Sequence, residues 1–176
     1  MSSLRFIKQE SFSNVTQLSM TDVFTSDFDI YKIVATGWDE VSGDTGRARL
    51  RFINSAGGID TSSSYKHASL AMESAQSGAY ATVASNSSDY VEFVLYDNGQ
   101  SGASSSGIMN IFNPTNSSSS TFLTFTESHY QNAYGASTNK GIGSYNVQNT
   151  ITGFSLHCSG GGAFNVRVIV YGLGVT

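Results

Sequence analysis

The stretch Arg47-Ala48-Arg49-Leu50-Arg51-Phe52-Ile53 decides the fold class, because charged and apolar side chains alternate along it. Successive side chains of a β-strand point to opposite faces, so the arginines share one face while Ala48, Leu50 and Phe52 share the other. Residues 54–58, Asn-Ser-Ala-Gly-Gly, are typical of a turn. We therefore predict a half-buried strand with Leu50 and Phe52 in the core and the arginines facing outward.

Similar segments recur along the chain and are separated by turns rich in Gly, Ser and Asn. About nine or ten short strands with little helix predict an all-β protein, an antiparallel, jelly-roll-like β-sandwich. The segment from Tyr65 to Ser85 is ambiguous, since Ala68 to Ala75 fits a short helix. The β-rich surroundings favour extended or irregular structure there.

Length and composition restrict both the organisation of the chain and its partners. The chain has 176 residues, 12% charged residues and a net charge of −4. This length predicts one domain, residues 1–176. Basic residues are scattered rather than clustered, which argues against binding to nucleic acid. No apolar run is long enough to span a bilayer, the first residues lack a signal-peptide pattern, and one Cys cannot form an internal disulfide.

Sequence patterns for catalysis, metal binding and cofactor binding are missing. His157 and Cys158 are neighbours on a predicted strand, so their side chains point to opposite faces and cannot easily share a metal. The sequence contains no nucleophile elbow and no complete phosphate-binding loop. We expect no enzymatic activity, no metal and no cofactor.

Four aromatic residues have two interpretations. Trp38 lies at the end of a predicted strand, and Tyr130, Tyr134 and Tyr145 lie in a loop-rich stretch. Exposed aromatic rings beside polar residues can stack on sugars. Packing inside the sandwich or at a subunit interface is the favoured alternative.

The N-terminal segment, residues 1–10, is a candidate arm or edge strand. Leu4, Phe6 and Ile7 are unusual in a disordered tail. Alternation places Leu4 and Phe6 on one face of a strand and Ile7 on the other. We expect this segment to pair with the edge of its own sheet or of a neighbouring subunit.

Five segments together resemble a group of small β-sandwich structural proteins of tailed bacteriophages, especially marine ones. The matching segments are residues 28–34 (FDIYKIV), 50–58 (LRFINSAGG) leading to Ser64-Tyr65, 107–114 (GIMNIFNP), 151–156 (ITGFSL) and 166–172 (VRVIVYG). They are spread in order over residues 28–172, most of the chain, and are structural motifs. The resemblance therefore transfers no functional residues.

The resemblance implies a virion component, either a capsid decoration or cement protein or a tail-fibre part. Because the chain is short and shows no shaft segment, we expect the capsid surface, with a tail-associated, glycan-binding receptor module as the alternative. Expected partners are further copies of the chain (a homotrimer by analogy), the major capsid protein or other virion proteins, and in the alternative a host surface glycan. The protein would reside in the virion, and in the host cytoplasm during assembly. Its neutral polar composition suits hydrogen-bonded contacts, which salt screens less than ion pairs.

Overall fold

The computed structural model describes residues 3–41, 46–74, 80–96, 104–131 and 135–174. Twelve strands and no helix are found in this part of the chain. In chain order the strands are β1 (Ser3–Val15), β2 (Gln17–Met20), β3 (Ile30–Glu40), β4 (Arg47–Asn54), β5 (Tyr65–Glu73), β6 (Tyr80–Ser88), β7 (Val91–Tyr96), β8 (Ser105–Phe112), β9 (Thr121–Gln131), β10 (Gly135–Tyr145), β11 (Ile151–Cys158) and β12 (Phe164–Gly174).

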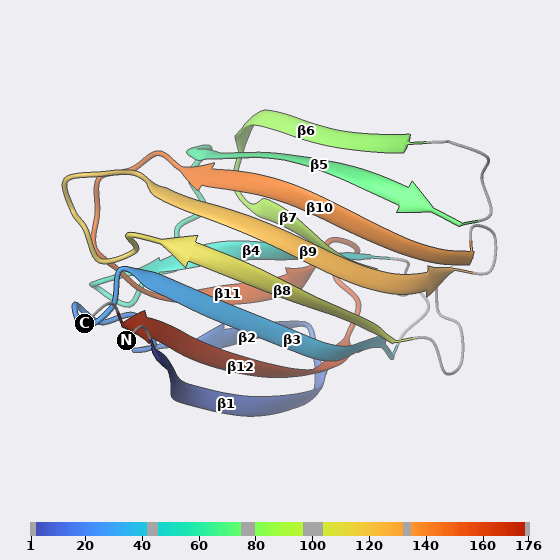
Figure 1. Ribbon diagram of the computed structural model, residues 1–176, viewed down its shortest axis with the longest axis horizontal. Helices are drawn as coiled ribbons and strands as arrows, with labels where there is room; N and C mark the ends of the chain where they lie inside the picture. The colour runs from blue at the N-terminus through green and yellow to red at the C-terminus, as the bar shows by residue number, and fades with distance from the viewer. Residues whose placement is uncertain (1–2, 42–45, 75–79, 97–103, 132–134, 175–176) are drawn as a thin grey trace.

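The strands form two antiparallel sheets that pack face to face (Figure 1). The large sheet has eight strands in the order β1-β12-β3-β8-β9-β10-β5-β6, and the small sheet has four in the order β2-β11-β4-β7. The hairpins β5–β6, β8–β9 and β9–β10 stay within the large sheet, whereas the other connections cross between the sheets. The predicted all-β, antiparallel sandwich is confirmed.

The core lies between the sheets and follows the alternation predicted for β4. Leu50 and Phe52 are fully buried, while the arginines of the same strand point to the opposite face. The predicted register of this strand is therefore confirmed. The bulkiest fully buried side chains are Trp38, Tyr31, Tyr65, Tyr145, Phe52, Phe93, Phe154 and Phe164.

Twelve strands exceed the expected nine or ten, for identifiable reasons. Residues 65–88 form β5 and β6, so the extended interpretation of Tyr65 to Ser85 is correct and the helix is not. The segment from Phe12 to Met20 contains the end of β1 and the whole of β2, and this division does not change the strand count. The chain bends at Asn14, which has a φ of 54° and donates its backbone N–H to the Asn165 side chain at 2.9 Å. The third addition is β10, which the sequence pattern did not predict.

The N-terminal segment belongs to β1, which forms one edge of the large sheet by pairing with β12 of the same chain. A register shift between Phe6 and Lys8 marks a bulge at Ile7. Ile7 packs against the core, whereas Leu4 and Phe6 remain exposed. The two faces of this strand therefore carry the residues assigned to them by alternation.

Candidate interaction surface

Exposed large hydrophobic side chains collect on one surface, the face of the large sheet turned away from the small sheet, here called the outer face. Strand alternation and register place the exposed large hydrophobic residues of the described strands on this face. They are Leu4, Phe6, Leu70, Met72, Ile108, Phe122, Tyr130 and Ile142. Val41, which is also exposed, follows the end of β3 and is not part of a strand. Phe6 and Ile142 are each 62% exposed. Contiguous apolar patches of this kind on a soluble protein mark interaction sites.

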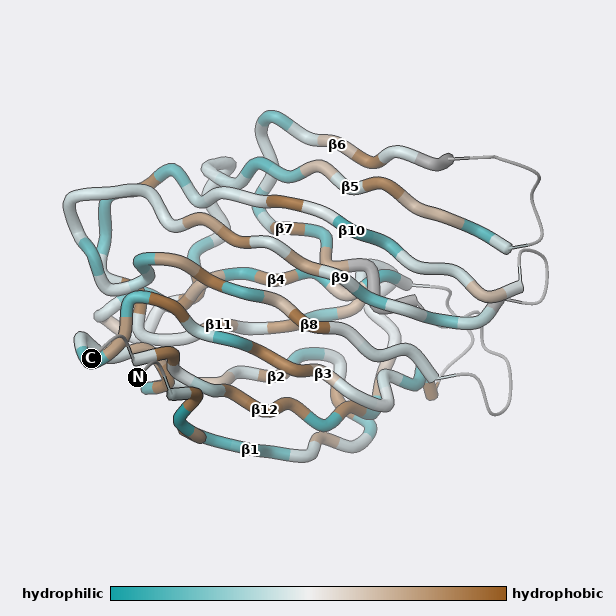
Figure 2. Tube along the Cα trace, viewed as in Figure 1, coloured by the Kyte–Doolittle hydropathy of each residue, from teal (hydrophilic) through white to brown (hydrophobic). Residues whose placement is uncertain are grey.

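The strand register joins these residues into rows across the sheet. One row crosses β1, β12, β3, β8 and β9 and consists of Leu4, Leu173, Ile30, Phe112 and Phe122. A parallel row contains Ile169, Val34 and Ile108 on β12, β3 and β8. Figure 2 shows the hydrophobic stretches of these neighbouring strands side by side. Each row is apolar along its length, while the row between them passes through Lys32, Asn110 and Thr124, so the surface consists of apolar bands that alternate with polar residues.

The outer face is also cationic. Lys32, Lys66, Lys140 and Arg167 occupy outward positions of β3, β5, β10 and β12. Among the described residues of the sheet, one carboxylate, that of Asp39, also points outward. It lies past the bulge at Gly37 and accepts a hydrogen bond from the Asn165 side chain. Removing the four cations from a chain of net charge −4 leaves about −8 on the remainder. The charge of the molecule is thus strongly asymmetric.

A shallow groove of about 450 Å³ crosses the outer face at β5, β6, β9 and β10. Phe122 and Ile142 provide apolar walls, and Lys66, Asn86 and Ser144 provide polar groups. Phe122 is 51% exposed, so one face of its ring is accessible. The groove combines the features of an amphipathic docking site.

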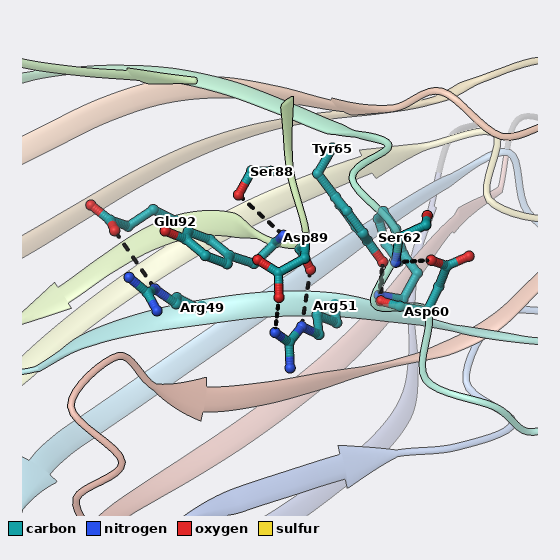
Figure 3. Close-up of polar contacts among 10 residues, drawn as sticks. Arg49, Arg51, Asp60, Ser62, Tyr65, Ser88, Asp89 and Glu92 are labelled. Carbon is teal, nitrogen blue, oxygen red and sulfur yellow. Dashed lines mark hydrogen bonds and ion pairs between the residues drawn. The ribbon is translucent and has the colours of Figure 1, made fainter. Parts of the chain in front are cut away.

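The arginine face of β4 lies on the other side of the molecule and is occupied by its own chain. Arg51 donates to the Asp89 carbonyl at 2.9 Å and forms an ion pair with the Asp89 carboxylate (Figure 3), while Arg47 pairs with Glu92 at 2.7 Å. The Arg49 guanidinium lies 3.9 Å from the centre of the Tyr90 ring. Arg49 and Arg51 therefore hold residues 89 and 90, between β6 and β7, against the small sheet, whereas Arg47 pairs with Glu92 of β7 and stays partly exposed.

Two histidines complete this arginine cluster and remain neutral. His67 stacks on Tyr90, and His157 contacts the edge of the same ring. Burial lowers the pKa of His67, and burial together with Arg51 and Arg49 lowers that of His157 to about 4. A nearby positive charge disfavours the protonated form of an imidazole, so the neutral form is favoured beside the arginines. These contacts indicate that the cluster of arginines, histidines and Tyr90 has a structural role.

Two of the proposed sugar-stacking residues are buried, which corrects their assignment to a ligand site. Trp38 is fully buried and stacks on Phe164 with ring centres 4.0 Å apart. Tyr145 is buried against Tyr65, and its hydroxyl donates to the Asp60 carboxylate. The Tyr65 hydroxyl accepts the Phe52 N–H and donates to the Asp60 carbonyl (Figure 3). Packing inside the sandwich, the favoured alternative, describes both residues.

The remaining candidates divide between the surface and the core. Leu4, Phe6 and Tyr130 lie on the outer face, Ile7 packs against the core, and Tyr134 lies outside the described residues. Sequence reasoning missed the other exposed residues of this face, Leu70, Met72, Ile108, Phe122 and Ile142. The sequence does indicate these residues, because segments such as Phe122-Leu123 carry apolar side chains on both faces of a strand.

The described residues contain no group of three or more metal-ligating side chains. Glu127 and His129 form a buried pair with His129 Nδ1 at 3.0 Å from the carboxylate, and burial raises the pKa of Glu127. Ser137 is the register partner of His129, but its hydroxyl makes no hydrogen bond to the ring. The pair is enclosed and lacks an activated nucleophile. No helix that could cross a membrane occurs in the part of the chain that the structure describes.

Comparison with known proteins found no matching family model and no matching curated protein. Among solved structures, the CBM2 module of the evolved Dit of Lactobacillus casei BL23 phage J-1 is 14% identical, with a TM-score of 0.35 over 91% of this chain and 69% of that chain. A fructosyltransferase from A. japonicus is 11% identical, with a TM-score of 0.41, and the chain spans 27% of its length. The VP2 subviral particle of infectious bursal disease virus has a TM-score of 0.16, 10% identity, and coverage of 100% and 42%. These scores are too low to establish a common fold, and we draw nothing from them about function.

Proposed function

We propose that this chain is a non-enzymatic structural protein of a phage virion, a decoration or cement protein of the capsid surface whose outer face is covered by a neighbouring protein in the particle. The apolar surface of the large sheet carries this proposal. Leaving so many large hydrophobic side chains in water is unfavourable by about 25 cal/mol for each Å² of apolar surface. Covering them with a neighbouring protein recovers that free energy.

Two further observations support a structural role in an assembly. The sequence segments that resemble small phage β-sandwich proteins include three adjacent strands of the large sheet, β12, β3 and β8, and the two central strands of the small sheet, β11 and β4. The outer face also mixes aromatic and aliphatic residues with neutral polar ones such as Asn110 and Thr124. Such a mixture of aromatic, aliphatic and neutral polar residues is usual in protein–protein interfaces.

Copy number in purified particles tests the proposal most directly. We expect hundreds of copies, as for a capsid surface protein, and few tens or fewer would indicate the tail instead. Ile142→Asp should abolish attachment to particles, because it places a charge at the centre of the apolar surface. Val41→Asp is the matched control, since Val41 is exposed to a similar degree and follows Glu40, at the opposite end of β3 from the row that contains Ile30 and Phe122. Particles that retain the Ile142→Asp protein would contradict the proposal.

The groove at Phe122 favours one alternative, a tail-associated module that binds a host glycan. An exposed aromatic ring beside Lys66, Asn86 and Ser144 could stack on a sugar and bind its hydroxyls. Glycan-array binding that is lost in Phe122→Ala and retained in Val41→Ala would support this function. Trp38 is unsuitable for such a test, because its replacement would empty the core.

A further inference from the structure

Some cationic side chains of the molecule form ion pairs with carboxylates, and others do not. Among the described residues, ion pairs engage Lys8 and all three arginines of β4, and the recorded pairs include none of the outer-face cations. Of these cations, Arg167 donates to the Thr36 hydroxyl, an uncharged partner, at 3.3 Å. The cations without a carboxylate are therefore concentrated on the same face as the exposed apolar residues.

Unpaired carboxylates are found at a different place, the loop of residues 21–29 between β2 and β3. Asp22, Asp27 and Asp29 are exposed there and take part in no recorded ion pair of the described residues. The loop lies near one end of the large sheet (Figure 1).

Several contacts hold this loop in one conformation. The backbone N–H groups of Val23 and Phe24 both donate to the Thr152 carbonyl, at 3.0 and 3.1 Å. The Tyr31 hydroxyl donates to the Thr25 carbonyl at 2.6 Å and accepts the Thr25 N–H at 2.7 Å. The loop therefore presents its carboxylates from a fixed backbone, which lowers the entropic cost of binding.

Charge determines how a second copy could cover the outer face. Two outer faces packed against each other would bring four cations against four cations, and like charges in an interface are unfavourable. The rest of the molecule, by contrast, carries about −8, and the 21–29 loop is a rigid part of it. An outer face therefore complements the loop of a second copy better than it complements itself.

We infer that the occupant of the outer face is a second copy of this chain, bound head to tail through its acidic 21–29 loop. Lys66 and Lys140 pair with Asp27 and Asp29 of the neighbour, while Ile142 and Phe122 are covered by the neighbour's surface. A head-to-tail contact uses two different patches, so it generates a ring when the rotation between copies closes. This inference rests on the proposed use of the outer face and does not depend on the particle that contains the protein.

Reciprocal charge reversal tests the contact by sedimentation velocity of the full chain. Lys66→Glu with Lys140→Glu and, separately, Asp27→Lys with Asp29→Lys should each raise the dissociation constant for self-association by about tenfold or more. Combining all four changes in one chain should restore association, because the charges again complement each other. Arg5→Glu is the control, since Arg5 is an exposed cation on the opposite side of β1 from Leu4 and Phe6. Circular dichroism of each variant establishes that it is folded.

Each outcome distinguishes the head-to-tail contact from its alternatives. The loop changes Asp27→Lys and Asp29→Lys leave the dissociation constant unchanged if two outer faces pack against each other. Association would then also strengthen between about 0.05 and 0.5 M NaCl, because salt screens the like charges, and this result would overturn the inference. A chain that remains monomeric at every concentration would also overturn it. If that monomeric chain still attaches to particles and Ile142→Asp prevents attachment, the proposed function stands and another virion protein covers the face.

Discussion

At the scale of single residues, Gly141 shows how tightly the two sides of a strand are constrained. A Cβ at this position would lie 2.2 Å from the Phe125 ring and 2.7 Å from the Ala68 carbonyl oxygen. The neighbouring outward residue, Ile142, is exposed to solvent. On β10, therefore, the inward position has no room for a methyl group and the outward position holds a large apolar side chain.

Gly141→Ala should destabilise the protein by about 1–3 kcal/mol, because overpacking displaces the Phe125 ring and the Ala68 backbone. Urea denaturation followed by circular dichroism measures this loss. Ser144→Ala, on the outward side of the same strand, should change the free energy of unfolding by less than about 0.5 kcal/mol. If Gly141→Ala were as stable as Ser144→Ala, the space beside Gly141 would be larger than the structure shows, and the prediction would be wrong.

At the scale of elements, β1 presents different residues to the core and to the surroundings. Ile7 packs against the core from the bulge, whereas Leu4 is exposed and lies in the apolar row of the outer face. Its edge position makes this strand the simplest place to separate stability from association.

Ile7→Ala should lower the free energy of unfolding by about 1–2 kcal/mol, since a half-buried side chain loses part of the usual Ile→Ala cost. Leu4→Ala should leave unfolding nearly unchanged and weaken attachment or self-association. Chemical denaturation and sedimentation measured on the same samples separate the two effects. The reverse pattern would mean that Leu4 is buried and Ile7 is not.

The sequence predicted those elements whose apolar residues alternate, and it failed where the alternation was concealed. On β4 the arginines and Leu50 mark the faces unambiguously. On β10 the inward positions before Tyr145 are Ser137, Asn139, Gly141 and Gly143, and at the two glycines Phe125 and Leu123 of β9 already fill the space. The outer face was missed for the opposite reason: β8 and β9 are apolar on both sides, and alternation alone does not tell which side is covered. Trp38 and Tyr145 were ambiguous for a related reason, since an aromatic residue near a strand end fits either a core or a platform.

At the scale of the whole molecule, strands from opposite ends of the chain depend on each other. β1 and β3 both pair with β12, and β2 pairs with β11. The N-terminal strands therefore have their partners only when the C-terminal strands are in place. This interleaving couples the two halves of the chain.

We expect one cooperative unfolding transition, with far-UV and near-UV circular dichroism giving the same midpoint. A chain that ends at residue 150 lacks β11 and β12 and should fail to fold, because β1 and β2 lose every strand partner. Tryptophan fluorescence provides a third probe, since Trp38 is buried against Phe164 of β12. Two separated transitions would show that the chain contains independent units.

The pairing of β1 with β12 also brings the two ends of the described chain together. Ser3 and Gly174 are register partners at one corner of the large sheet (Figure 1). A short peptide could therefore join Ser3 to Gly174, and new ends could be opened in a hairpin such as β8–β9 to give a circularly permuted protein with the same two sheets. Conversely, a peptide or fluorophore fused next to Ser3 or to Gly174 would emerge beside Leu4 and Leu173, so the same corner would serve for display in either case.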